Sequence, residues 1–220
     1  MNILITGTSQ GIGLAIAKKF LIEGHKVYGV DIKKSALPYT DYTHFELDIR
    51  DKKALINLAI NLPLMDIVVN NAGTQNEDDI QTNLMGTMNV TEAFGIQKNI
   101  KAILMIGSAS AHTGAEFAEY SASKGGVLAY TKYVALHIAE FGATCNSLDL
   151  GGVLTDLNAP VINDKALWEQ IMDLTPLKRW MTAEEAADWA YFLTVINHAC
   201  TGQNILVDNG EAGNCKFIWK

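Results

Sequence analysis

The sequence predicts an α/β protein built on a doubly wound parallel sheet of about seven strands, with helices on both faces. Short apolar runs alternate along the 220 residues with segments of helical spacing. Such nearly continuous apolar strands are typical of a parallel sheet that is covered on both sides. A glycine-rich turn joins the first strand to the first helix. Polar residues or glycines follow most of the strands, at the edge where such sheets bind ligands.

The elements follow one another in a regular order. The first strand is the run Ile3 to Ile5, and the stretch LAIAKKFLIEG after Gly13 has helical spacing. Further strands are expected at residues 25–31, 43–48, 65–70, 101–107, 143–150 and 204–207. Helices are expected at residues 51–61, 82–97, 118–141 and 183–195, and residues 155–175 are expected to be irregular or helical. No linker or repeat interrupts this order, so residues 1–220 are expected to form one domain.

Composition limits the classes of protein. Hydrophobic content of 49% and charged content of 19% favour a folded globule. The net charge of −7 does not favour nucleic-acid binding, and no apolar run is long enough to span a membrane. The N-terminus leads directly into a strand without a signal segment. Cys145, Cys200 and Cys215 form no paired motif, so we expect a reduced, cytoplasmic protein with apolar thiols and no metal site.

The stretch Asn2 to Gly13 reads NILITGTSQGIG. Glycine permits a positive φ and the close approach of a ligand, and the N-terminus of the following helix attracts phosphate. The G-x3-G-x-G spacing differs from the commonest dinucleotide fingerprint, and glycine turns also occur in methyltransferases and in ordinary structural turns. A dinucleotide is the favoured ligand. The residues expected to contact it here are Gly7, Ser9, Gln10, Gly11, Ile12 and Gly13.

Asp31 closes the second expected strand. A carboxylate at this position accepts hydrogen bonds from an adenosine ribose and repels a 2′-phosphate. Lys33 and Lys34 follow and partly offset that repulsion. NAD is therefore the preferred cofactor, although NADP is not excluded. The alternative role for Asp31 is that of a helix cap or a solvated loop acid.

Tyr120 and Lys124 lie in the expected helix at residues 118–141, in the motif YSASK. Side chains at i and i+4 share one helix face. An ammonium group near a phenol favours the phenolate, so it should lower the tyrosine pKa from its usual value of about 10. Such a phenol can exchange a proton with an alcohol oxygen, and Ser108 can donate a hydrogen bond to the same oxygen. An exposed helical pair is the alternative explanation of Tyr120 and Lys124.

Further motifs accompany the turn and this pair. Residues 70–73 read NNAG, Asn83 lies in NLMGT, and PLKRWMTAEEAADWAYFL and TGQNILVDNG follow near the end. With a TGxxxGxG-like turn at Thr6 to Gly13 and a YxxxK motif preceded by a serine, the chain resembles the short-chain dehydrogenase/reductase family over nearly its whole length. The resemblance implies a Rossmann-like fold, NAD(P)-dependent interconversion of an alcohol and a ketone, and a homodimer or homotetramer.

The resemblance also implies a role for each site residue. Tyr120 is the general acid/base, and Ser108 orients the alcohol or carbonyl. Lys124 binds the nicotinamide ribose, and Asn83 holds a water that links Lys124 to solvent. Asp48 and Ile49 bracket the adenine, and Val153 and Thr155 meet the carboxamide. The cofactor-binding residues beyond the glycine turn are then Asp31, Asp48, Ile49, Asn70, Ala72, Gly73, Tyr120, Lys124, Val153 and Thr155.

Several features depart from this family pattern or leave alternatives open. The segment from Gly73 to Asn83 is short, which could displace Asn83. Leu150-Gly151, preceded by Asp149, stands where the family usually has proline-glycine. The segment from Asp156 is expected to lie over the substrate, either lining the pocket or packing into the core; its apolar residues are Leu157, Val161, Ile162, Leu167 and Trp168. His112 either faces substrate or is a hydrogen-bonded structural residue. An NAD-binding regulator without turnover and a methyltransferase are the competing functions.

Overall fold

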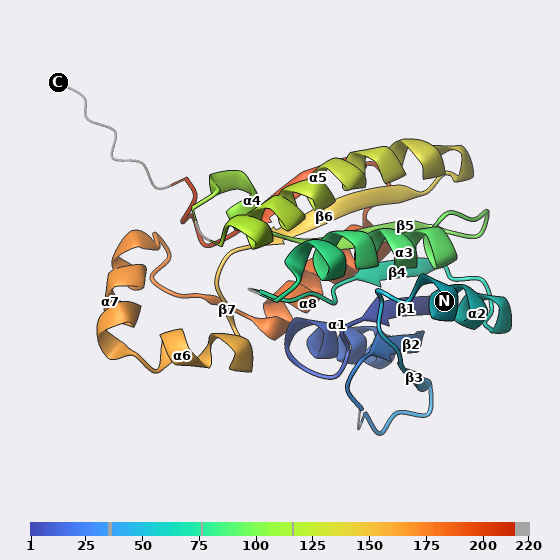
Figure 1. Ribbon diagram of the computed structural model, residues 1–220, viewed down its shortest axis with the longest axis horizontal. Helices are drawn as coiled ribbons and strands as arrows, with labels where there is room; N and C mark the ends of the chain where they lie inside the picture. The colour runs from blue at the N-terminus through green and yellow to red at the C-terminus, as the bar shows by residue number, and fades with distance from the viewer. Residues whose placement is uncertain (35–36, 76, 116, 214–220) are drawn as a thin grey trace.

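The computed structural model describes residues 1–34, 37–75, 77–115 and 117–213. Within these residues, seven parallel strands form one sheet in the order β3-β2-β1-β4-β5-β6-β9, as Figure 1 shows in part. The doubly wound α/β prediction is confirmed. The strands are β1 (Asn2–Thr6), β2 (Lys26–Asp31), β3 (Tyr42–Glu46), β4 (Ile67–Asn70), β5 (Ala102–Ser108), β6 (Thr144–Leu150) and β9 (Asn204–Val207). Cys215 lies outside the described residues.

The helices cover both faces of the sheet, and each face has its own apolar core. One core contains α1 (Gly11–Ile22) and α8 (Ala183–Tyr191). The other contains α2 (Lys52–Asn61), α3 (Thr87–Val90) and α5 (Ala118–Ile138). Two π-helical segments, η1 (Ile80–Gly86) and η2 (Thr91–Gly95), flank α3, and a third, η5 (Phe192–Ile196), follows α8.

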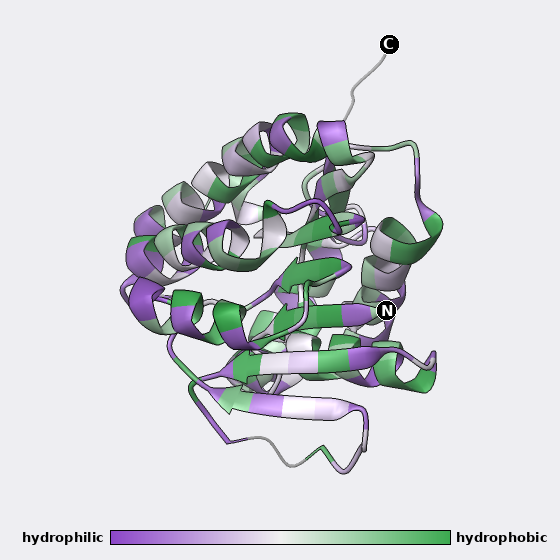
Figure 2. Cartoon of the chain, turned by 90° about the vertical axis from the view of Figure 1, so that its right-hand side faces the viewer, coloured by the Kyte–Doolittle hydropathy of each residue, from purple (hydrophilic) through white to green (hydrophobic). Residues whose placement is uncertain are grey.

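Alternation along the strands divides their side chains between the two cores. In β1, Ile3 and Ile5 belong to the core with α1 and α8, whereas Leu4 belongs to the opposite core. All three are fully buried, as the two-residue period of a covered strand requires. Figure 2 shows hydrophobic colour along the inner strands of the sheet, more hydrophilic colour on its edge strand, and hydrophilic colour on the outer sides of the helices.

Two small features were not predicted. A second sheet pairs β7 (Val153–Leu154) with β8 (Met181–Thr182), and a short helix, α4 (Ser110–Thr113), follows β5. Two-residue strands and a four-residue helix are too short to produce a periodic pattern. The end of β5 also differs from the expectation, because Ser108 is the last residue of the strand and pairs with Leu150 of β6.

The segment of residues 156–174, called the lid segment here, is helical. It comprises a 3₁₀ turn (Asp156–Asn158), α6 (Ala159–Ile162) and α7 (Lys165–Leu174), and α6 and α7 stand apart from the sheet on the left of Figure 1. Neither helix buries a residue. Leu157 is 67% exposed and Leu167 is 40% exposed, so these two residues of the lid segment do not pack into the core, whereas Trp168 packs edge-on against the buried Trp180.

Candidate active site

The glycine turn follows β1 and is closed by backbone contacts. Gly7 has a φ of +75°, and a Cβ at this position would lie 2.6 Å from Asn71 Nδ2. A Cβ at Gly13 would overlap the carbonyl oxygen of Gly7. Gly11 lies beside Thr155, since a Cβ there would be 3.7 Å from Thr155 Cγ2. Glycine is therefore required where the turn folds back, and the loop after β6 meets the same turn.

The N-terminus of α1 suits an anionic ligand. Gln10 precedes the helix without a side-chain capping bond, and the first turn carries no acidic residue. The N–H groups at the start of α1 and the helix dipole are thus available for a phosphate. Gln10 itself accepts a hydrogen bond from Lys33 Nζ at 2.9 Å, and Ile12 packs against the core. The turn fits the pyrophosphate of a dinucleotide.

Asp31 belongs to this turn and caps no helix. Its Oδ2 accepts a hydrogen bond from the Ser9 backbone N–H at 2.9 Å, and its Oδ1 accepts one from the Lys33 N–H at 2.9 Å. The Ser9 hydroxyl donates to the Lys33 carbonyl. Two backbone donors thus orient the carboxylate at the end of β2, where a ribose would be held.

Asn71, which the sequence analysis did not select, ties the NNAG segment to the glycine turn. Its Nδ2 donates to the carbonyls of Thr6 and Gly7, and the Thr6 hydroxyl accepts from the N–H groups of Asn71 and Ala72. Asn70 instead points into the core, where it donates to the Thr91 hydroxyl at 3.0 Å. The motif alone does not distinguish the two asparagines, because strand geometry decides which side chain faces the turn.

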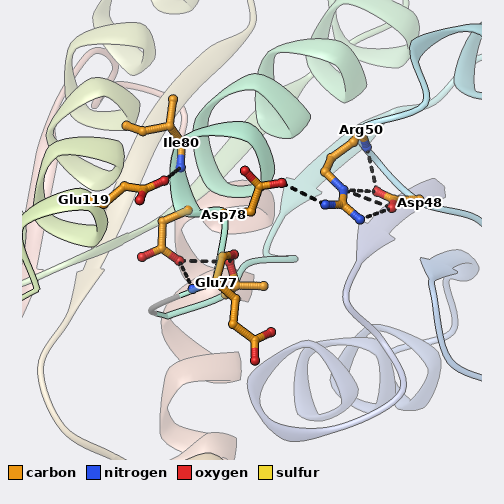
Figure 3. Close-up of polar contacts among 8 residues, drawn as sticks. Asp48, Arg50, Glu77, Asp78, Ile80 and Glu119 are labelled. Atoms are coloured by element: carbon orange, nitrogen blue, oxygen red, sulfur yellow. Dashed lines mark hydrogen bonds and ion pairs between the residues drawn. The ribbon is translucent and has the colours of Figure 1, made fainter.

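The side chains of Asp48 and Ile49 are engaged elsewhere. Arg50 Nη2 approaches Asp48 to 2.6 Å and its Nη1 approaches Asp78 to 2.9 Å, which links two loops at this edge (Figure 3). The Arg50 guanidinium holds the pKa of Asp48 below its usual value. Ile49 packs beneath Gly86 in the core. Contact of these two residues with adenine remains a prediction.

Ser108, Tyr120 and Lys124 come together at the carboxyl end of β5. Ser108 ends the strand, and Tyr120 and Lys124 lie on successive turns of α5. The Lys124 Nζ is 5.8 Å from the centre of the Tyr120 ring and donates to the Ile106 carbonyl at 2.8 Å. The Lys124 side chain is buried, so the alternative of an exposed helical pair does not hold.

Asn83 remains at this site although the segment before it is short. Its Nδ2 donates to Ser123 Oγ and to the Thr74 carbonyl, both at 3.0 Å, and its Oδ1 accepts from the Thr74 N–H at 2.7 Å. A Cβ at Gly73 would lie 2.8 Å from Asn83 Oδ1 and 3.6 Å from Lys124 Nζ. The NNAG segment therefore runs from the glycine turn to the Lys124 amine.

Burial moves the two key pKa values in opposite directions. It lowers the pKa of Lys124 to about 8, against the opposing effect of Asp149 and Asp79. It raises the pKa of Tyr120; a hydrogen bond with Ser108 opposes this and the charge of Asp79 adds to it. The expected lowering of the Tyr120 pKa by Lys124 is not found in this structure, because desolvation of the phenolate outweighs the favourable contacts.

The remaining predicted residues flank this group. Val153 is buried in β7, and its carbonyl accepts from Asn158 Nδ2 at 2.8 Å. His112 Nε2 lies 2.6 Å from Asp149 Oδ2, so His112 is a hydrogen-bonded structural residue. Asp149 and Asp79 were not predicted as site residues, since nothing in the sequence places them beside Lys124. The described part of the chain holds no cluster of three metal-ligating side chains and no helix long and apolar enough to cross a membrane.

Comparison with known proteins places the chain in a family. A family model described as enoyl-(acyl carrier protein) reductase matches residues 7–211. The 3-oxoacyl-[acyl-carrier-protein] reductase of Buchnera aphidicola (subspecies Acyrthosiphon pisum) is 30% identical over 233 aligned positions, which cover 94% of this chain and 95% of the relative. The 2-(R)-hydroxypropyl-CoM dehydrogenase of Xanthobacter autotrophicus is 29% identical, with 95% and 94% covered.

A solved structure also shows similarity to a 3-oxoacyl reductase. The 3-oxoacyl-[acyl-carrier protein] reductase with bound NAD from Brucella melitensis superposes with a TM-score of 0.84 at 25% identity, covering 95% of this chain and 90% of that one. The fold and the relatives thus define the class as an NAD(P)-dependent oxidoreductase of Rossmann-like architecture. The chain belongs to the short-chain dehydrogenase/reductase family.

Proposed function

We propose that this protein is an NAD(H)-preferring enzyme that interconverts a secondary alcohol and a ketone. The observation that carries the proposal is the meeting of Ser108, Tyr120 and Lys124 at the end of β5, joined by residues 71–73 to the glycine turn. A turn suited to a dinucleotide and a group suited to proton transfer are thus parts of one continuous site.

Each side chain has a definite task in this proposal. A nicotinamide cofactor bound there would accept or supply the hydride, which is chemistry that the side chains cannot provide. Tyr120 takes the alcohol proton during oxidation and returns it to the carbonyl oxygen during reduction. Ser108 donates a hydrogen bond to that oxygen, and Lys124, whose amine lies 5.8 Å from the centre of the Tyr120 ring, would bind the nicotinamide ribose. Asn83 fixes the loop at Thr74 beside Lys124.

Asp31 supports a preference for NAD. Its carboxylate is oriented by Ser9 and Lys33, and it would lie against a 2′-phosphate. The NAD-bound relative from Brucella melitensis is consistent with this proposal. Lys33 and Lys34 reduce the repulsion, so NADP is expected to bind more weakly and not to be excluded.

The proposed substrate class rests on the side chains of the lid segment and on the names of the relatives. The lid segment supplies exposed apolar side chains, among them Leu157 and Leu167, and no arginine for a carboxylate or phosphate. A 3-hydroxyacyl thioester is the first substrate to test, because two relatives are named as 3-oxoacyl reductases. Polyols and hydroxysteroids are the other substrates in the test panel. A cytoplasmic homodimer or homotetramer is part of the same proposal.

The test is NAD-dependent oxidation of this panel, followed by NADH absorbance, with reduction of the matching ketones by NADH as the reverse assay. Thermal-shift measurements with NAD, NADP and S-adenosylmethionine establish which cofactor binds. Turnover with NAD that exceeds turnover with NADP supports the proposal. Binding of NAD without turnover of any alcohol or ketone would favour the regulatory protein.

A further inference from the structure

A carboxylate is buried on the opposite side of the site from the glycine turn. Asp149 lies on β6 beside Gly107 of β5, and its side chain is 0% exposed. A Cβ at Gly107 would overlap Asp149 Oδ1, so the glycine leaves room for the carboxylate to lie across the backbone of β5. Burial raises the pKa of Asp149. An isolated charge in such a place is costly unless partners compensate it.

Asp149 has one close partner that reaches the surface. His112 on α4 approaches Asp149 Oδ2 with its Nε2 at 2.6 Å, and the His112 side chain is 31% exposed. This hydrogen bond opposes the effect of burial on the pKa of Asp149. The other oxygen, Oδ1, has no hydrogen-bond partner among the described residues. His112 therefore leaves Oδ1 without a direct hydrogen bond, although the Ser147 hydroxyl also opposes the rise in the Asp149 pKa.

Lys124 donates from its Nζ to the carbonyl of Ile106, the residue before Gly107, so its amine lies at the same stretch of β5 as the Asp149 carboxylate. Asp149 and Asp79 are the two groups whose charges oppose the lowering of the Lys124 pKa, and Asp149 has the larger effect. Asp79 acts from the short segment before η1, whereas Asp149 acts from β6. Lys124 therefore faces two acidic side chains, which come from different parts of the chain. Asp149 in turn faces two basic side chains, those of Lys124 and His112.

We propose that Asp149 and His112 are a positioning pair for Lys124: the carboxylate keeps the buried amine charged, and the imidazole keeps the carboxylate in place and ionised. The inference rests on the proposed function only because Lys124 is one of the site residues beside Tyr120 in that proposal. No bond is made or broken by the pair. Its effect is electrostatic, so it can be measured on the protein without substrate.

The measurement is an NMR titration of the full, unliganded chain carrying [ε-¹³C]lysine, with Lys124→Met used to assign the signal. Lys124 should titrate near pH 8 in the wild type. In Asp149→Asn its midpoint should fall by roughly one pH unit, as expected when an opposite charge is removed at short range. Glu140→Gln also removes one negative charge, from the exposed turn after α5, and should leave the midpoint unchanged.

Two His112 variants separate charge control from simple packing. His112→Gln retains a donor for Asp149 and should preserve the Lys124 midpoint. His112→Leu removes the donor that holds the carboxylate in place and opposes the rise in the Asp149 pKa, so the Lys124 midpoint should move toward that of Asp149→Asn. Rescue by glutamine but not by leucine would support the inference, whereas equal midpoints in the two variants would overturn it.

Turnover gives a second readout. The alkaline limb of alcohol oxidation, where Lys124 loses its proton, should move to lower pH in Asp149→Asn by the same amount as the NMR midpoint. A loss of rate without movement of either midpoint would assign Asp149 a purely structural role and overturn the inference. An NMR shift in a protein that turns over no substrate would support the pair and overturn the proposed function.

Discussion

At the residue scale, Tyr120 shows how burial and hydrogen bonding compete in one side chain. Burial raises its pKa, and the Ser108 hydrogen bond opposes this. The phenol is therefore protonated at neutral pH in this structure, which suits donation to a carbonyl oxygen. The proton-transfer role can be tested by removing the hydroxyl alone.

We predict that Tyr120→Phe folds and binds NAD but loses turnover by at least about 10²-fold, since general acid/base catalysis contributes 10²–10⁴-fold. Ring packing is nearly conserved, so the melting temperature should change little. Tyr133→Phe is the matched control, because that ring is 51% exposed on the same helix. Turnover of Tyr120→Phe within about twofold of wild type, roughly 0.4 kcal/mol in barrier, would remove Tyr120 from the mechanism.

Asp31 is the second residue whose chemistry can be tested alone. Asp31→Asn removes the charge and keeps one acceptor oxygen for the backbone N–H groups of Ser9 and Lys33 in place of two, so the dissociation constant for NADP should fall relative to that for NAD. We expect the ratio of the two constants to change by about tenfold, equivalent to roughly 1.4 kcal/mol. Asp41→Asn, an exposed acid before β3, should leave the ratio unchanged. Tighter binding of NADP than NAD by the wild type would contradict the prediction.

At the element scale, the junction of β1 and α1 depends on the absence of side chains. Gly13→Ala would place a methyl group against the Gly7 carbonyl, so we predict loss of NAD binding and a lower melting temperature. Gly125→Ala is the same substitution in α5, where a Cβ meets no atom within 4 Å. It should stabilise the protein by about 0.5–1 kcal/mol, as alanine does in a helix interior. Equal effects of the two substitutions would contradict the role assigned to the turn.

At the scale of the whole molecule, α5 carries exposed apolar surface away from the active site. Tyr133 is 51% exposed and Leu136 is 79% exposed. Tyr133 also lines a shallow pocket of about 220 Å³ with Met88, Glu92, Ile96 and Tyr130. Contiguous apolar surface of this kind is typical of an interface between proteins. We therefore expect two copies of the proposed homodimer or homotetramer to pair through this helix.

We predict that light scattering gives a dimer or tetramer at micromolar concentration and that Leu136→Glu shifts it to lower mass. A buried, unpaired carboxylate in the interface would oppose association. Ile60→Glu is the matched control, because Ile60 is 76% exposed on α2 and lies outside this patch. A monomer mass for the wild type, or the same loss of mass in both variants, would be evidence against pairing through α5.

Much of the architecture follows from local pattern. The apolar strands, the helical segments between them and the glycines of the first turn predict a doubly wound sheet, because each signal depends on neighbours close in sequence. The YxxxK spacing likewise places Tyr120 and Lys124 on one helix face. Short elements such as β7, β8 and α4 produce no such pattern, which is why they could not be predicted.

Only the tertiary structure shows what surrounds each side chain. Asn71, not Asn70, closes the turn because the last pleat of β4 directs Asn70 into the core. Asp149 comes close to Lys124 because β5 and β6 pair in register with Gly107 opposite the carboxylate. The direction of the Tyr120 pKa shift depends on burial by residues far away in sequence. Spacing along a chain determines which residues share a face, whereas desolvation and charge depend on every element packed around them.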